Sequence, residues 1–269
     1  MSLTINTNVE ALDAQRNLSS TENSLAMSME RLSSGLKINS AADDVAGYAI
    51  SERLQSQING IGQAEQNSQD AVSLAQTAQG SLNEVEQMLQ RVRELAVQYA
   101  NGTNSASDKE AIGGEVSQLN SEIERVGETT KFNGISLLSG ATSITFQVGA
   151  NETSGKAEET ISVKTFELAK TVGTISLGEA KDIEKIETAI AAVAKAAGEF
   201  GSVQNRLQYT QSNLAIYSQN LSAAQSSIVD ANMAAETTNF TKDQVLQQAG
   251  VSVLAQAKSL PQAVLKLLE

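Results

Sequence analysis

Residues 50–99 read ISERLQSQINGIGQAEQNSQDAVSLAQTAQGSLNEVEQMLQRVRELAVQY, and one row of small and apolar side chains runs the length of this stretch. Its members alternate intervals of four and three residues, and only Gln57 and Ser68 among them are polar: Ile50, Leu54, Gln57, Ile61, Ala64, Ser68, Ala71, Ala75, Ala78, Leu82, Val85, Leu89, Val92, Ala96 and Tyr99. Such a sustained seam is typical of a coiled coil. At 1.5 Å per residue the helix would be roughly 75 Å long.

Two further stretches carry the same spacing and are predicted to pack against the first. One row runs from Ile183 to Ala235, and a shorter one runs from Ile112 to Val126. Ser107 followed by Glu110 resembles a capping box at the start of the shorter helix. The expected fold is mostly α: a long antiparallel helical bundle, or coiled coil, in which three helices share one seam.

Residues 131–178 have a different composition, rich in turn residues and β-branched side chains. The segments TSITFQV (142–148) and TISVKTF (160–166) alternate apolar and polar residues, as half-exposed strands do. A polar loop joins them. We therefore expect a small β-hairpin region at about residues 131–178 that covers one end of the bundle.

Both ends of the chain carry helical stripes without an obvious partner in the bundle. Burying a leucine is worth roughly 1.5–3 kcal/mol, so we expect helices in residues 1–39 and 236–269 to pair. Residues 40–235 would form the bundle. Two narrow helices would still leave apolar surface exposed, which favours assembly with copies of the same chain. The C-terminal stripe runs from Leu246 to Leu267. We expect the N-terminal stripe to pack against this one and neighbouring copies to cover the remainder. The residues expected to make these contacts and so to carry polymerisation are Leu18, Leu25 and Leu32, which pack against Val253, Leu260 and Val264.

Residues 31–50, RLSSGLKINSAADDVAGYAI, interrupt the helical spacing between the N-terminal stripe and the bundle. Gly35 follows a leucine-rich turn, as a glycine that ends a helix does. Ser40, with Asp43 three residues later, resembles a capping box, and Asp43 and Asp44 suit the positive end of a helix dipole. Paired carboxylates for acid–base chemistry are the alternative, but the motif holds no His or Cys partner.

The composition argues against most enzymes and several kinds of partner. There is no histidine and no cysteine, so the chain lacks thiol nucleophiles and the side chains that most transition metals prefer. Its net charge of −12 repels nucleic acid and anionic lipid. We expect no enzyme activity, cofactor, metal, nucleic acid or membrane partner. No cleavable export signal or membrane-spanning stretch is expected, so these features alone indicate a cytoplasmic protein.

Four separated blocks resemble the N- and C-terminal regions of bacterial flagellin. They are SLTINTNVEALDAQRNL (2–18), SMERLSSGLKINSAADDVAGYAISERLQSQINGI (28–61), TTKFNGISLL (129–138) and AQAKSLPQAVLKLLE (255–269). The region between the row that ends at Val126 and the row that begins at Ile183 is short, which leaves no room for the variable outer domains of many flagellins. The resemblance is therefore to a short form of that family.

This resemblance implies a structural subunit that polymerises into the flagellar filament, with the paired terminal helices as its inner tube and the bundle as its outer shell. It also implies secretion by the flagellar type III apparatus to the extracellular flagellum, which would replace the cytoplasmic expectation. The partners it implies are other copies of the chain, an export chaperone, the filament cap and the hook-junction proteins.

The segment LQRVRELAVQ (89–98) is similar to the flagellin surface that an animal Toll-like receptor recognises. By that resemblance the receptor contacts are Gln90, Arg91, Leu95 and Gln98 on one helix and Glu115 on its neighbour. The glycines at 113 and 114 would loosen the second helix beside Glu115. A solvated face of the bundle around Arg91 is the alternative interpretation.

Three other classes of protein remain open at this point. A hook–filament junction protein would share the terminal helices but would form a capped assembly. A flagellin with a metalloprotease insert would need a pair of histidines, which this chain does not have. A soluble coiled-coil adaptor would not need the hairpin or the paired ends.

Overall fold

The structure, a computed structural model, describes residues 8–140, 142–151, 159–178 and 181–268, with side chains described as far as residue 259. These residues form six helices and two antiparallel strand pairs. The elements are α1 (Val9–Ser34), α2 (Val45–Tyr99), α3 (Ala106–Thr129), β1 (Lys131–Phe132), β2 (Ile135–Ser136), β3 (Ser143–Gln147), β4 (Thr160–Lys164), α4 (Leu168–Val172), α5 (Asp182–Val229) and α6 (Met233–Leu268). The mostly helical class expected from the sequence is confirmed.

The chain divides into two compact units, and the dividing points lie within α2 and α5. Residues 1–56 and 221–269 make up one, called here the terminal unit. Residues 57–220 make up the other, called the bundle unit.

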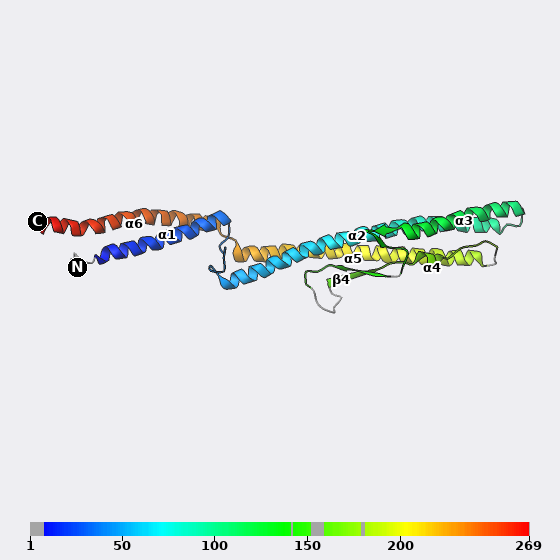
Figure 1. The fold of residues 1–269 in the computed structure, drawn as a ribbon, viewed down its shortest axis with the longest axis horizontal. Helices are drawn as coiled ribbons and strands as arrows, with labels where there is room; N and C mark the ends of the chain where they lie inside the picture. Colours follow the sequence, from blue (N-terminus) through cyan, green and yellow to red (C-terminus); the bar gives the residue numbers. More distant parts are fainter. Residues whose placement is uncertain (1–7, 141, 152–158, 179–180, 269) are drawn as a thin grey trace. The chain divides into compact units, whose positions relative to one another are not determined.

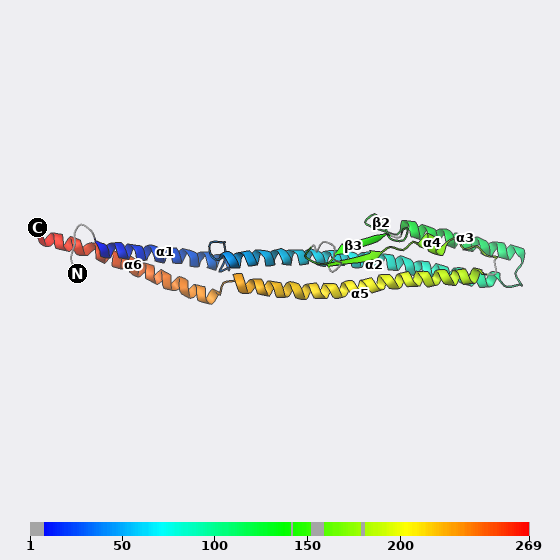
Figure 2. The same cartoon turned by 90° about the horizontal axis from the view of Figure 1, so that it is seen from below.

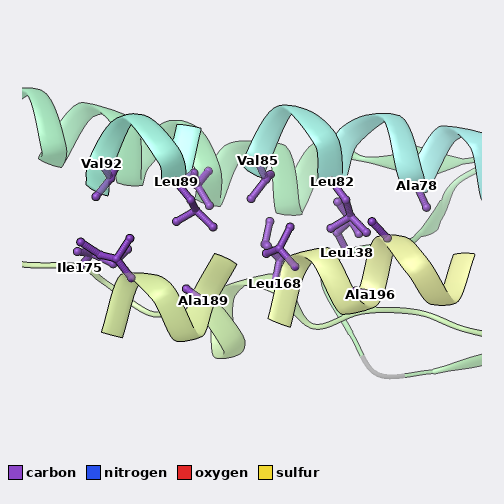
Figure 3. Close-up of a cluster of buried hydrophobic side chains, with 14 of the residues drawn as sticks. Ala78, Leu82, Val85, Leu89, Val92, Leu138, Leu168, Ile175, Ala189 and Ala196 are labelled. Carbon is purple, nitrogen blue, oxygen red and sulfur yellow. The ribbon is translucent and has the colours of Figure 1, made fainter. Parts of the chain in front are cut away.

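In the bundle unit, α2, α3 and α5 run alongside one another (Figures 1 and 2). Their buried apolar side chains form most of the larger of two hydrophobic clusters in this unit. The row predicted along α2 is buried from Ile61 to Ala96. Figure 3 shows part of this row facing side chains of α5 and of the segment around α4. Ser68, a polar member of the row, donates its hydroxyl to the carbonyl of Ala64 at 2.8 Å, so its burial leaves that donor satisfied.

The cap of α3 lies two residues earlier than the sequence pattern predicted. Ser105 is extended and its hydroxyl accepts from the N–H of Asp108, while the Asp108 carboxylate accepts from the N–H of Ser105 at 2.9 Å. The prediction of Ser107 with Glu110 is therefore wrong, because the helix has already begun at Ala106. The helix continues without a break through its two adjacent glycines.

The predicted strands are present, but they lie along the bundle and not over its end. β3 and β4 pair antiparallel, with Ile144 opposite Val163. Val148 and Ile161 pack against Ala71 and Val72 of α2 and Leu207 of α5. These contacts lie far from the ends of both helices, so the expected position over one end is wrong.

A close approach and a hydrogen bond fix the hairpin to α2. A Cβ placed on Gly60 would lie 3.0 Å from the Cβ of Ala150, so only a residue without a side chain leaves that gap free. The side-chain amide of Asn67 donates to the carbonyl of Gln147 at 3.0 Å. The short β1–β2 hairpin turns through Asn133 and Gly134, both with positive φ, as tight hairpin turns require.

In the terminal unit, α1 and α6 lie side by side and antiparallel (Figures 1 and 2). The row predicted from Ile183 to Ala235 does not lie in one helix, because α5 ends at Val229 and α6 begins at Met233. Asn232 causes the restart, since its side-chain oxygen accepts from the N–H groups of Ala234 and Ala235 at 3.1 and 3.2 Å.

Candidate functional site

Three contacts set the register of α1 against α6. The side chain of Asn8, which caps α1, donates to the carbonyl of Ala257 at 2.8 Å. In the middle, Leu18 packs so closely on Gly250 that an added Cβ would meet its Cδ1 at 3.2 Å. Near the other end the Ser28 hydroxyl donates to the Glu236 carboxylate at 2.6 Å, with both residues buried.

The side of α6 that faces α1 is more polar than the sequence analysis assumed. Its half-buried and buried residues recur at four and three residues: Glu236, Phe240, Asp243, Gln247, Gly250, Leu254 and Ala257. On α1, Leu18, Leu25 and Leu32 are half-buried. The seam of the helix pair therefore combines leucines from one helix with mostly small and polar side chains from the other.

The apolar stripe predicted for α6 lies only partly in this seam: Ala257 is buried there, whereas Leu246, Ala249 and Val253 lie beside the seam and are exposed. Val253 is 55% exposed and Leu246 is 46% exposed. At about 100° per residue, the stripe through these two is turned roughly a quarter of a circle from the row that faces α1. The predicted packing of Val253 on the N-terminal stripe of its own chain is therefore wrong. The side chains of Leu260 and Val264 lie outside the described residues.

A shallow groove continues this open side of α6 toward its start. It is lined by Thr237, Thr238, Thr241, Lys242, Val245 and Leu246. The three threonine hydroxyls already donate to backbone carbonyls one turn earlier in the helix, at 2.8 to 2.9 Å. Their methyl groups are therefore what the groove offers to a partner. We call the surface formed by Thr241, Val245, Leu246, Ala249 and Val253 the open face of α6.

The joint between α1 and α2 is built by Gly35 and two aspartates. Gly35 has φ 75° and its N–H donates to the carbonyl of Arg31, so the predicted glycine cap is confirmed. Asp43 accepts from the backbone N–H groups of Ser40 and Asn39, which lower its pKa. Ser40 and Asp43 thus form a turn before the helix.

The capping of α2 belongs to the next residue, Asp44. Its side chain accepts from the N–H groups of Ala46 and Gly47, both at 3.0 Å. The predicted capping box at Ser40 is therefore wrong, since α2 begins only at Val45. Gly47 is also fixed by this geometry, because a Cβ there would lie 2.5 Å from the Asp44 carboxylate.

The surface around Arg91 brings together most of the residues that the resemblance assigns to receptor contact. The Arg91 guanidinium binds Glu115 at 2.8 Å and Glu94 at 3.2 Å. The hydrogen bond that Arg91 donates to the Glu115 carboxylate is the main reason that the pKa of Arg91 is raised. Gln90 and Gln98 are exposed nearby on α2.

Leu95 does not belong to this surface. Only 1% of it is exposed, and it packs in the core of the bundle unit. The predicted direct contact by Leu95 is therefore wrong, because its side chain points away from solvent. Arg91 and Glu115 form an exposed ion pair whose carboxylate and guanidinium hold each other in place.

The described ranges offer neither a metal site nor a membrane-spanning helix. No group of three or more Asp and Glu side chains there is arranged to hold a metal ion. In the same ranges no helix combines the length and hydropathy that a membrane crossing requires.

Comparison with known proteins identifies the family. A model of the bacterial flagellin N-terminal helical region matches residues 5–143, and a model of the C-terminal helical region matches residues 183–268. A flagellin of Halalkalibacterium halodurans is 44% identical over 98% of this chain and 99% of its own. A flagellin of Bacillus subtilis is 40% identical over the same shares. The chain belongs to the bacterial flagellin family.

Flagellins are structural proteins that form the bacterial flagellar filament outside the cell. The alignment to the H. halodurans flagellin spans 272 residues, which confirms the short form. A solved structure titled as a putative flagellar hook-associated protein from Vibrio parahaemolyticus has a TM-score of 0.59 at 14% identity. It covers 70% of this flagellin and 100% of that chain, and at such low identity it shows a shared fold alone.

Two features of this flagellin were not predicted from the sequence. One is the Ser28–Glu236 pair, although a serine beside the leucine stripe of the N-terminal helix is a usable signal. The other is the direction of the most apolar stripe of α6, which was expected on the inside of the helix pair. Apolarity alone could not separate a face that meets α1 from one that is open in a single chain.

Proposed function

We propose that this flagellin polymerises into a filament through its terminal helices, and that the open face of α6 is covered by neighbouring copies. The observation that carries the proposal is the exposure of Val253 and Leu246 beside a seam of small and polar residues. About half of each side chain is already covered, so burying the rest is worth roughly 1 kcal/mol each. Only contacts outside the helix pair can supply that gain.

The role of Leu18, Leu25 and Leu32 in this proposal is indirect. They hold α1 against α6 and thereby fix the position of the open face. Leu260 and Val264 continue the sequence stripe of Leu246 and Val253 and are included in the proposed contact on that basis.

Charge substitutions on opposite sides of α6 test the proposal. Val253→Glu and Leu246→Glu place a carboxylate in the proposed contact and should raise the critical concentration for polymerisation at least tenfold. Gln244→Glu is the matched control, because nine residues turn the helix by about half a circle from Val253. It adds the same charge to the same helix and should leave polymerisation unchanged.

Sedimentation and negative-stain microscopy after salting out give the readout. Fibres of uniform width are expected from the intact chain, and none from a chain that lacks residues 250–269. The proposal fails if the truncated chain still forms long fibres, or if the two glutamate variants polymerise at the same concentration as the control.

The family also motivates a route to the filament and a set of partners. We propose export by the flagellar type III apparatus, with an export chaperone, the filament cap and the hook-junction proteins as partners. The absence of cysteine supports passage as an extended chain, since no disulfide can form before export. Secretion of the protein by a strain lacking the flagellar export ATPase would refute this route.

We propose, as a second function, recognition by the host Toll-like receptor at Gln90, Arg91, Gln98 and Glu115. The proximity of Arg91 and Glu115 in one exposed ion pair supports it. Arg91→Ala should reduce receptor signalling at least tenfold in a reporter cell line. Arg125→Ala is the control, because Arg125 is also an exposed arginine paired with a glutamate. Equal signalling by both variants would refute the assignment.

A further inference from the structure

The part of α5 between Leu207 and Asn220 carries no Asp, Glu, Lys or Arg. In a chain with 19% charged residues, a stretch of this length would hold about three. Apolar burial does not explain the absence, because most of these residues are exposed and only Leu207 and Leu214 are buried. A solvent-exposed helix face without charged residues is unusual in a protein of net charge −12.

Large apolar side chains are exposed on the same part of the helix. Tyr209 is 79% exposed and Ile216 is 60% exposed. Seven residues separate them, so they lie on one side of the helix, two turns apart. Asn213 and Asn220 are exposed on the same side. We call Tyr209, Asn213, Ile216 and Asn220 the neutral face of α5.

The contacts between α2 and α5 change character at the same place. Away from the neutral face, Arg93 of α2 binds Glu187 of α5 at 2.8 Å, as the flanks of a coiled coil usually do. Near the neutral face the corresponding link is an amide pair, in which Gln211 donates to Gln69 at 3.2 Å. Uncharged groups therefore replace an ion pair where the surface is neutral.

We infer that the neutral face of α5 binds a second copy of this chain, and this inference rests on the polymerisation proposed above. Two copies that each carry a charge of −12 repel one another. The repulsion is smallest where the approaching surface has no charge, and like charges set opposite one another at an interface cost several kcal/mol. Tyr209 and Ile216 then gain burial without desolvating a charged group.

The chemistry of the face argues for a protein partner and against other occupants. It holds no Lys or Arg to bind nucleic acid or anionic lipid. Tyrosine is enriched in the buried centres of protein interfaces, and Asn side chains suit the polar groups around them. A growing polymer requires two different surfaces to meet, so the neutral face is expected to cover a different part of the next copy.

Single cysteines test this inference directly, because the chain has none of its own. Tyr209→Cys, Ile216→Cys and the control Lys195→Cys are each alkylated as monomers and as fibres. Lys195 is exposed on α5, two heptads before Tyr209, so it lies near the same side of the helix but outside the uncharged stretch. Alkylation at 209 and 216 should slow at least tenfold in fibres, and alkylation at 195 should change less than about twofold.

Charge insertion gives a second readout. Tyr209→Glu and Ile216→Glu should raise the critical concentration at least tenfold, whereas Ala194→Glu, an exposed position earlier on α5, should not. Circular dichroism of the monomers should be unchanged, because all three positions are exposed.

The outcomes separate this inference from the function on which it rests. If the intact chain forms no fibres, both are refuted. If it forms fibres in which cysteines at 209 and 216 react as fast as in monomers, or no slower than cysteine at 195, the inference about the neutral face is refuted and polymerisation stands.

Discussion

Two glycines in α2, Gly60 and Gly62, should respond differently to the same substitution. Both lie in the interior of one long helix, where alanine is favoured over glycine by about 1 kcal/mol. A Cβ on Gly62 would meet nothing within 4 Å. Gly62→Ala should therefore stabilise the protein by about 1 kcal/mol.

At Gly60 the same methyl group meets the β3–β4 hairpin. The added Cβ would lie 3.0 Å from the Cβ of Ala150, 3.3 Å from its Cα and 3.4 Å from its carbonyl oxygen. Two of these three atoms are backbone, so the hairpin must shift as a whole. Overpacking of this kind costs about 1–3 kcal/mol. Gly60→Ala should therefore be between neutral and about 2 kcal/mol destabilising.

Urea unfolding followed by circular dichroism measures both effects, and equal m-values would show that the unfolded states are comparable. The two variants should differ by about 1–3 kcal/mol. Adding Ala150→Gly to Gly60→Ala should recover part of the loss, since the nearest contact is removed. Equal stabilisation by Gly60→Ala and Gly62→Ala would show that the hairpin does not rest on α2 as described.

Three further predictions follow from the caps, the core and the terminal seam. The hydrogen bond from the capping serine lowers the pKa of Asp108 in the folded protein. The stability that the ionised Asp108 contributes is therefore complete above the unfolded pKa of about 3.9 and is lost as the pH falls through the folded pKa. The melting-temperature difference between Asp108→Asn and the unaltered chain should shrink between about pH 6 and pH 2, and a constant difference would contradict the cap. Leu89→Ala, in the closed core, should cost about 2–5 kcal/mol in urea unfolding, whereas Val97→Ala, at an exposed position on the same helix, should cost less than about 0.5 kcal/mol. Ser28→Ala removes the donor to the buried carboxylate of Glu236 and should destabilise the terminal helix pair by about 1.5–3 kcal/mol, seen as earlier thermal dissociation of fibres; unchanged dissociation would mean that the hydrogen bond contributes nothing.

The long helices were predictable because a repeating row specifies both the helix and its buried side. The row from Ile61 to Ala96 predicted the buried residues of α2 without any knowledge of its partners. Caps were harder, since Ser105 and Ser107 both start an S-x-x-acid pattern. Only the backbone conformation, extended at Ser105, decides between them.

Positions that depend on packing between distant segments were not predictable. The strand pattern of residues 160–166 predicts a strand but not that Ile161 packs on Val72 of α2. The stripe through Leu246 and Val253 was correctly found, and its direction was not. Leu95 was placed on the receptor surface by resemblance. Its burial in the core could be predicted only with the positions of α3 and α5 known.

The narrow seam between α1 and α6 has a thermodynamic consequence. The pair has little stability of its own, because leucines of α1 meet mostly small and polar side chains of α6. Its remaining apolar surface is buried only by contact with a neighbouring molecule. Its melting temperature should therefore depend on protein concentration, as it does for obligate oligomers. Each tenfold rise in the concentration of free chains would add about 1.4 kcal/mol to the ordering of this pair.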